Sequence, residues 1–203
     1  MPATAETPKS TDTGDSAALA LRVATREAHQ NAERTPPMQA LSEGQLDRAG
    51  YHALLRAQWP IFLHFEQAAR RWLDDDVPAA GWHYRSRLPA LAADLGDRPD
   101  MAPLVPRLPT HDADACWGML YVVEGSTLGA RLLSRQLAAL LGGHSDDFRF
   151  YTLGEDEPAR WPAFRRVLDA QLTAPQQRAR AIEGAHAMFA AFHYQFRHWQ
   201  AHG

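Results

Sequence analysis

The chain has 203 residues, of which 45% are hydrophobic, so it is long enough for one domain with a substantial core. Its 21 basic and 24 acidic side chains leave a formal charge of −3, which gives no bulk attraction to nucleic acid. It contains no run of about eighteen apolar residues and no signal-peptide pattern, and its single cysteine excludes an internal disulfide, so we expect a cytoplasmic protein that binds neither nucleic acid nor membrane.

The N-terminal segment differs in composition from the first predicted helix. Residues 1–16 contain Pro, Thr, Ser, Ala and acidic residues without an apolar period, which predicts a disordered tail ahead of a single domain at residues 17–203. A helix is expected from about Ser16, which can cap it, to Arg34, because the prolines that follow cannot continue it.

One face of this first helix carries four polar side chains. Arg22, Arg26, His29 and Glu33 are spaced by 4, 3 and 4 residues, so they lie on the same side, with Glu33 one turn beyond His29. A stripe of small apolar residues runs beside them. A single histidine in this position is more often a packed residue than a metal ligand, so the helix alone leaves both roles open.

A long helix is expected over residues 47–72, after a short turn-like element at residues 38–44. Its apolar stripe keeps a three-to-four spacing throughout, and Pro60 should bend it locally. The stripe consists of Tyr51, Leu55, Gln58, Phe62, Phe65, Ala69 and Trp72. The acidic run at residues 74–76 has the composition of a metal cluster, but a solvated helix end is the expected structure.

The second half of the chain is also predicted to be helical, apart from one short segment. Phe148 to Leu153 is the only strand-like run, and it is too short to form a sheet. Helices are expected over residues 82–96, from Asp112 or Asp114 to Leu141, over residues 160–172, and from Ala174 to about Trp199, with a proline-broken connection at 101–109. With no repeat, dinucleotide fingerprint or phosphate loop, the pattern predicts an all-α, single-domain bundle of about seven or eight helices.

The predicted helix that ends at Leu141 has an unusual stripe of glycines. Gly118, Gly125 and Gly129 fall on one face, and each interior glycine costs about 1 kcal/mol relative to alanine. A surface without Cβ atoms allows a large, flat ligand to lie against the backbone. It equally allows close contact with another helix, so the stripe alone leaves two explanations.

The last predicted helix carries an aromatic stripe that includes Phe189, Phe192 and Phe196. Such a stripe is core far more often than it is a cofactor wall. The pair His198 and His202 has the spacing of metal ligands on a helix, but it lies where the chain end frays, and we expect no metal there.

Taken together, these segments resemble the heme oxygenase family. Leu21-Arg22-x-Ala24-Thr25-Arg26-x-x-His29 resembles the proximal helix of that family, and Glu124-Gly125-Ser126-Thr127-Leu128-Gly129-Ala130 resembles the distal helix of its bacterial members. The resemblance extends over roughly residues 19–200 through further matches at Gly44-Gln45, Arg48, Gly50-Tyr51, Glu66, Phe150-Tyr151-Thr152, Phe164-Arg165 and Pro175. The motifs Glu-Gly-Ser-x-Leu-Gly and Leu-Pro-Ala-Leu resemble those of the bacterial subgroup that makes biliverdin for bacteriophytochromes.

The resemblance implies a helical bundle in which heme lies between a proximal helix and a kinked, glycine-containing distal helix. It implies cleavage of heme by O2 and reducing equivalents to biliverdin, ferrous iron and CO. The electron donor would be a ferredoxin, a flavodoxin or a reductase, and in the phytochrome-linked subgroup a bacteriophytochrome would receive the biliverdin. Heme would be both substrate and cofactor.

The resemblance also assigns roles to particular residues. His29 would ligate the iron through Nε2, and Glu33 would accept the Nδ1 proton through a weak or water-mediated contact. Gly125 and Gly129 would give O2 its confined space, while Ser126 and backbone carbonyls would hold the ordered water that delivers protons. The remaining heme contacts would be the propionate-binding Arg22, Arg26 and Arg165 and the aromatic wall of Phe189, Phe192 and Phe196.

Three positions depart from the family pattern. Ser126 replaces the aspartate of the mammalian members, Phe62 replaces a distal tyrosine, and Ala130 replaces the second glycine of a common pair.

Two other functions compete with the enzyme: a heme carrier of the same fold without catalysis, and a helical interaction protein without a cofactor. The glycines at 125 and 129 favour the enzyme, because carriage needs no confined O2.

Overall fold

The computed structural model describes residues 16–100, 106–144, 147–153 and 157–199, so all but the last residue of the predicted disordered tail lies outside the described ranges. Every regular element in these ranges is helical, which confirms the predicted all-α class. The elements follow in chain order as α1 (Ala17–Ala24), α2 (Arg26–Glu33), α3 (Pro36–Ser42), α4 (Arg48–Ala68), η1 (Trp72–Asp76, a π-helical turn), α5 (Val77–Ala79), α6 (Leu88–Leu95), α7 (Ala113–Gly125), α8 (Thr127–Leu141), α9 (Arg149–Thr152), α10 (Arg160–Gln171) and α11 (Pro175–Arg197).

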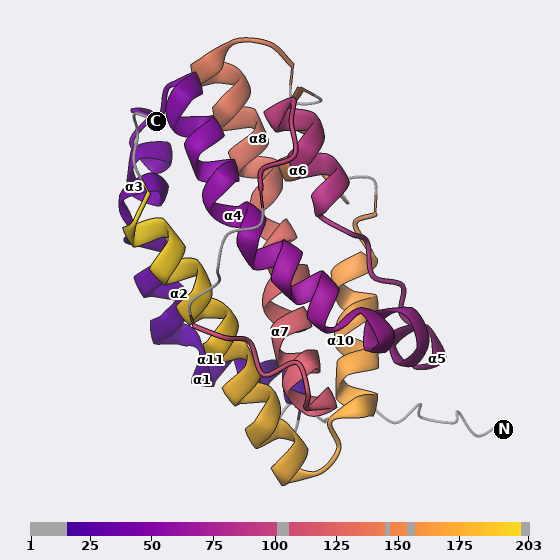
Figure 1. Cartoon of the computed structure of the whole chain (residues 1–203). Helices are drawn as coiled ribbons and strands as arrows, with labels where there is room; N and C mark the ends of the chain where they lie inside the picture. The colour runs from indigo at the N-terminus through magenta and orange to yellow at the C-terminus, as the bar shows by residue number, and fades with distance from the viewer. Residues whose placement is uncertain (1–15, 101–105, 145–146, 154–156, 200–203) are drawn as a thin grey trace, which may run out of the picture.

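The last helix, α11, organises the bundle because it packs along α7 and also contacts α1, α2, α3 and α4 (Figure 1). Its buried face carries the predicted aromatic stripe, and Phe192 makes an edge contact with Phe62 of α4 and a tilted ring contact with Phe196. The predicted buried stripe of α4 is confirmed from Tyr51 to Trp72. Helix α4 continues through Pro60.

Two glycines bring the backbones of α7 and α11 into contact. A Cβ atom at Gly118 would lie 1.7 Å from the carbonyl oxygen of Ala181, and a Cβ at Gly184 would lie 2.0 Å from the carbonyl oxygen of Ala115. Neither position can therefore hold a side chain without moving a helix. Close helix packing explains Gly118, and this contact fixes α7 against the central helix.

The first predicted helix is divided into α1 and α2 at Thr25. The Thr25 hydroxyl donates a hydrogen bond to the Leu21 carbonyl, as serine and threonine do when they bend helices. Backbone hydrogen bonds still bridge the division, because the His29 amide donates to the Thr25 carbonyl. The expected N-cap is present at Ser16, and Asp169 of α10 accepts hydrogen bonds from the Ser16 hydroxyl and the Ala18 amide, which anchors α1.

Three sequence predictions of secondary structure are wrong. The turn-like element expected over residues 38–44 is the helix α3, which begins with two prolines at its first turn. The helix expected over residues 82–96 begins only at Leu88. The preceding residues instead bond to side chains of other elements, as the Tyr84 hydroxyl does when it donates to Glu66 of α4. The strand-like run at 148–153 forms the short helix α9. Asp94 accepts the Arg149 and Phe150 amides at 2.9 Å and thereby satisfies the first turn of that helix.

The acidic run at 74–76 is a solvated turn, as predicted. Asp74 and Asp75 form exposed ion pairs with Arg70 and Arg71, one turn earlier. Among the described residues, no group of three or more His, Cys, Asp or Glu side chains could hold a metal ion. Within the same residues, no helix is long and apolar enough to cross a membrane.

Candidate functional site

The histidine singled out in the sequence is exposed on α2. The side chain of His29 is 58% exposed, and its Nδ1 atom lies 3.5 Å from a carboxylate oxygen of Glu33. The ring also meets the edge of Phe189 on α11, with 5.8 Å between the ring centroids. These contacts hold the ring on one side and leave it open to solvent on the other, so His29 is placed to bind a ligand rather than to fill the core.

The three predicted aromatic residues of α11 are brought together, but only one of them touches the histidine. Phe189, Phe192 and Phe196 are each less than one-tenth exposed. Phe189 contacts His29, whereas Phe192 packs on Phe62. Phe62 is buried and packs on Phe150 as well, so its position is part of the core.

Two of the three predicted cations act electrostatically on one half-buried phenol. Burial raises the pKa of Tyr121 on α7, and the positive charges of Arg22 and Arg165 oppose that rise. This opposition means that a cation from α1 and a cation from α10 both lie near the Tyr121 hydroxyl. Both arginines are exposed, so their guanidinium groups are available to an anionic ligand. Arg26 is exposed on α2, and no described contact links it to this pair.

The long glycine-containing helix is interrupted at Ser126, between α7 and α8. The Ser126 hydroxyl donates to the Val123 carbonyl at 2.8 Å, and the Thr127 hydroxyl donates to the Glu124 carbonyl at 2.7 Å. Side chains that bond to carbonyls of the preceding turn compete with the helical amides and bend the helix. The Ser126 oxygen can still accept a hydrogen bond from water, as its predicted role requires.

The glycines on either side of this interruption have different surroundings. A Cβ atom at Gly125 would lie 3.4 Å from the ring of Trp161, whereas a Cβ at Gly129 would have no heavy atom within 4 Å. On the same helix, Leu128 and Leu132 are 59% and 63% exposed. Gly129 therefore opens onto free space, next to apolar side chains that a bound ligand could cover.

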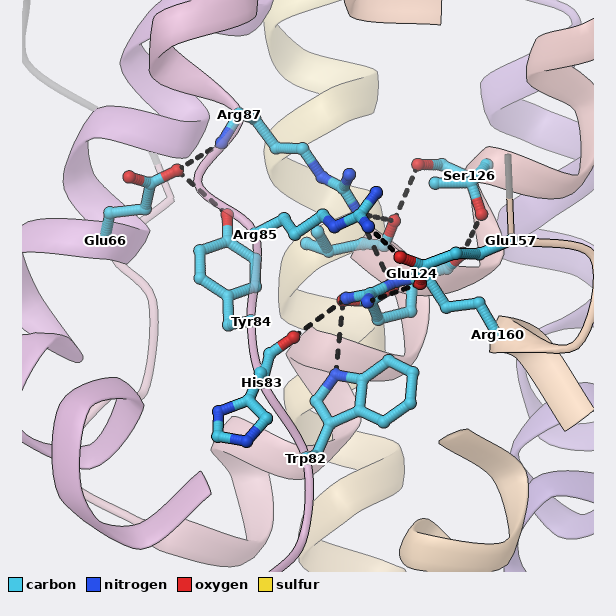
Figure 2. A network of polar contacts seen from close by, with 12 residues as sticks. Glu66, Trp82, His83, Tyr84, Arg85, Arg87, Glu124, Ser126, Glu157 and Arg160 are labelled. Atoms are coloured by element: carbon cyan, nitrogen blue, oxygen red, sulfur yellow. Dashed lines mark hydrogen bonds and ion pairs between the residues drawn. The ribbon is translucent and has the colours of Figure 1, made fainter. Parts of the chain in front are cut away.

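A buried charge cluster lies directly behind the interruption, and the sequence predictions missed it (Figure 2). Glu124 is 1% exposed, yet its carboxylate is an ion-pair partner of Arg160 and Arg87. The signal in the sequence is a carboxylate that directly follows two apolar residues, Val122 and Val123. The partners could not be predicted, because they come from two distant segments of the chain.

Comparisons with known proteins agree on one family. The family model described as Heme oxygenase matches residues 15–198. A heme oxygenase from Xanthomonas campestris pv. campestris (strain 8004) is 42% identical over 159 residues, which cover 77% of this chain and 94% of that protein.

Solved structures support the same fold. The heme oxygenase of Leptospira interrogans matches with a TM-score of 0.67 at 20% identity, over 90% of this chain and 99% of that chain. Heme oxygenase-1 from the cyanobacterium Synechocystis sp. PCC 6803, solved in complex with heme, matches with a TM-score of 0.66 at 16% identity, over 90% of this chain and 91% of that chain.

Proposed function

The chain belongs to the heme oxygenase family, and from this membership we infer that it cleaves heme with O2 and reducing equivalents to biliverdin, ferrous iron and CO. The observation that carries the assignment to particular residues is the exposed imidazole of His29, with its Nδ1 atom 3.5 Å from Glu33. An imidazole whose Nδ1 faces a carboxylate can offer Nε2 to iron, because the carboxylate fixes the ring and its tautomer.

The described residues fit a heme. An apolar, flat ligand needs a surface without side chains, and Gly129 opens onto free space beside the exposed Leu132. The two propionate carboxylates of heme need cations at an accessible edge, and Arg22 and Arg165 are exposed near Tyr121. Bound heme supplies the iron that activates O2 and the porphyrin that is cleaved.

On the proximal side, we propose that His29 is the iron ligand and that Glu33 orients it. The 3.5 Å separation is longer than a normal hydrogen bond, so Glu33 aligns the ring through a weak contact. A weak contact of this kind is the one expected for a heme oxygenase, since a tightly paired carboxylate favours peroxidase chemistry. Phe189 supports the ring from α11, and Phe192 and Phe196 extend the apolar wall.

On the distal side, we propose that Gly125 and Gly129 confine O2 and that Ser126 helps to hold water for proton delivery. The described site has no acid placed for this step, because the Glu124 carboxylate is already paired with two arginines. Water held by the Ser126 oxygen and by backbone carbonyls is the proton source that these residues support.

The partners follow from the reaction. We propose a ferredoxin, a flavodoxin or a reductase as the electron donor, and a bacteriophytochrome as the recipient of biliverdin.

The reducing cytoplasm is the proposed location, and the single cysteine suits it. Cys116 is buried and free, and burial raises the pKa of its thiol to about 12, so its nucleophilic thiolate is scarce at neutral pH.

Reversing the charge of Arg165 should change which edge of the heme is cleaved. If Arg22, Arg26 and Arg165 hold the propionates, they fix the rotation of the heme in its plane. Arg165→Glu should weaken heme binding by roughly 5- to 10-fold, since a half-exposed charge-assisted contact contributes about 1 kcal/mol or slightly more. The wild type should give mainly the α isomer of biliverdin, and the variant a mixed product that chromatography resolves.

The neighbouring Arg166 provides a matched control, because it is exposed on the same helix. Arg166→Glu makes the same change in net charge and should keep the wild-type isomer ratio. Equal ratios in the Arg22, Arg26 and Arg165 variants would mean that the distal helix alone selects the cleaved edge, and the propionate assignment would then be withdrawn.

One series of spectra tests the proposed function. Purified protein titrated with hemin should give a Soret band with 1:1 stoichiometry. Addition of a reductase or ascorbate in air should then replace that band with the absorption of biliverdin. A Soret band that persists under reducing conditions would favour the heme-carrier function instead.

A further inference from the structure

The buried charge cluster next to the interruption at Ser126 is centred on one carboxylate, that of Glu124. One oxygen of Glu124 accepts hydrogen bonds from Arg160 Nη2 at 3.0 Å and from the Trp82 indole at 3.4 Å. The other oxygen accepts from Arg160 Nε at 3.1 Å and lies 3.6 Å from Arg87 Nη2. Arg160 thus binds the carboxylate with two nitrogens, the strongest geometry for this pair.

Burial makes this arrangement energetically demanding. Glu124 is 1% exposed and Arg87 is 3% exposed, so both charges have lost their hydration. The desolvation penalty of such buried ions is large, and only well-aligned partners offset it. A hydrophobic contact of similar volume would stabilise the fold at least as well. The cluster therefore gives the fold a defined geometry more than it gives net stability.

The cluster joins three segments that are far apart in the sequence. Arg160 begins α10, Glu124 is the last residue but one of α7, and Trp82 and Arg87 flank the extended segment that precedes α6 (Figure 2). Arg160 also stacks on Trp82, with its guanidinium carbon 4.3 Å from the ring centroid, and donates to the His83 carbonyl. These contacts position the end of α7 relative to two other elements of the bundle.

The contacts of the cluster reach the backbone at the interruption itself. Arg87 Nη2 lies 3.5 Å from the Val123 carbonyl, which also accepts the Ser126 hydroxyl. The residue after Arg160 is Trp161, whose ring lies 3.4 Å from the Cβ position of Gly125. Side chains of the cluster and the residue next to it therefore contact the backbone from which α8 leaves α7.

We propose that Glu124, Arg160 and Arg87 are positioning residues for heme cleavage, which fix the exit of α8 from α7 and so place Gly129 relative to the bound heme. This inference rests on the proposed function. None of the three touches the heme in this scheme. They act through the backbone of residues 123–129, and their loss should alter which edge of the heme is attacked before it alters how tightly heme binds.

The same helix α10 couples this placement to the propionate site. Arg160 holds the distal interruption, while Arg165 lies on the same helix near Tyr121. Trp161, between them, packs on Tyr121 with 5.5 Å between the ring centroids. In this scheme α10 therefore fixes both the position of the distal helix and the rotation of the heme. Because one rigid helix fixes both, the cleaved edge of the heme can be the same in every molecule.

Two variants test the proposal in the full-length protein. Glu124→Gln keeps the shape of the side chain but leaves the buried Arg87 without its carboxylate, while Arg160 keeps its ion pair with Glu157, and it should lower thermal stability. Arg160→Lys keeps the charge and loses the bidentate geometry, so it should fold even if Glu124→Gln does not. Both should raise the share of minor biliverdin isomers several-fold, while the Kd for hemin stays within about threefold of the wild type.

Amide exchange provides a readout without heme. In the heme-free variants, exchange at residues 125–129 should accelerate by about tenfold or more, because the cluster no longer restrains the interruption. Asp114→Asn is the matched control: Asp114 binds Arg180 of α11 from the first turn of the same helix α7. This control should keep the wild-type isomer ratio and the wild-type exchange at 125–129.

The outcomes separate the alternatives. Wild-type isomer ratios and wild-type exchange in both test variants, with only a lower melting temperature, would show a purely structural ion pair and overturn the proposal. Failure of the wild type to bind hemin or to form biliverdin would instead overturn the proposed function. The exchange data alone would then show whether the cluster restrains residues 125–129.

Discussion

His29→Ala should abolish heme cleavage while leaving the fold almost intact. The side chain is more than half exposed, and its partner Glu33 is equally exposed, so their contact contributes at most about 0.5 kcal/mol to stability. As the proposed iron ligand, however, His29 has no substitute on α2. Turnover should fall by more than about 100-fold, since even partners outside the ligand sphere cost about 10- to 100-fold when removed. Biliverdin formation and thermal unfolding measure the two effects separately.

His193→Ala is the control for this experiment. His193 lies on α11 beside a cavity of about 400 Å³ that is also lined by Arg197 and His198, and it is the next candidate if His29 fails. Its variant should keep the wild-type spectrum and turnover. Added imidazole should restore part of the ferric spectrum of His29→Ala. An unchanged spectrum with full turnover in His29→Ala would transfer the ligand assignment to His193.

The helices that carry local signals were predictable from the sequence. Ser16, Asp47 and Asp112 cap α1, α4 and α7 through hydrogen bonds to amides three residues later, as their side-chain chemistry predicts. The amphipathic periods of α4 and α11 also predict their buried faces correctly. Where a contact between distant residues decides the structure, the sequence pattern fails. Helix α9 depends on Asp94, which is 55 residues from Arg149, and no local pattern contains that contact.

The candidate site divides in the same way. His29 and Glu33 lie together as expected, because they share one helix, whereas the contact between Phe189 and His29 was not predicted. Glu124 is visible in the sequence only as part of the distal-helix motif. Its role depends on Arg87 and Arg160, which reach it from opposite directions along the chain. A buried carboxylate can be suspected from its apolar neighbours, but its partners require the fold.

The glycines of α7 and α8 show that one spacing pattern can serve two purposes. Gly118 meets the backbone of α11 at a distance that excludes any side chain, so it is a packing glycine. Gly129 meets nothing within 4 Å, although it costs about 1 kcal/mol of helix propensity relative to alanine. Packing explains the first cost and leaves the second without a structural reason. A ligand that must approach the backbone supplies that reason.

An ordinary core substitution lowers stability. Gly129→Leu should instead lower turnover without lowering stability. The leucine meets no neighbour in the heme-free protein and improves helix propensity, so thermal stability should be unchanged or slightly higher. The side chain would fill the space proposed for O2, so turnover should fall by about 100-fold while heme affinity falls only modestly. Gly118→Ala is the control, because its Cβ would collide with the Ala181 carbonyl and should cost about 1–3 kcal/mol or more without a specific loss of turnover per folded molecule. Urea unfolding and single-turnover kinetics on both variants distinguish the two glycines. A Gly129→Leu protein that unfolds early yet degrades heme at the wild-type rate would make Gly129 a packing residue and remove it from the site.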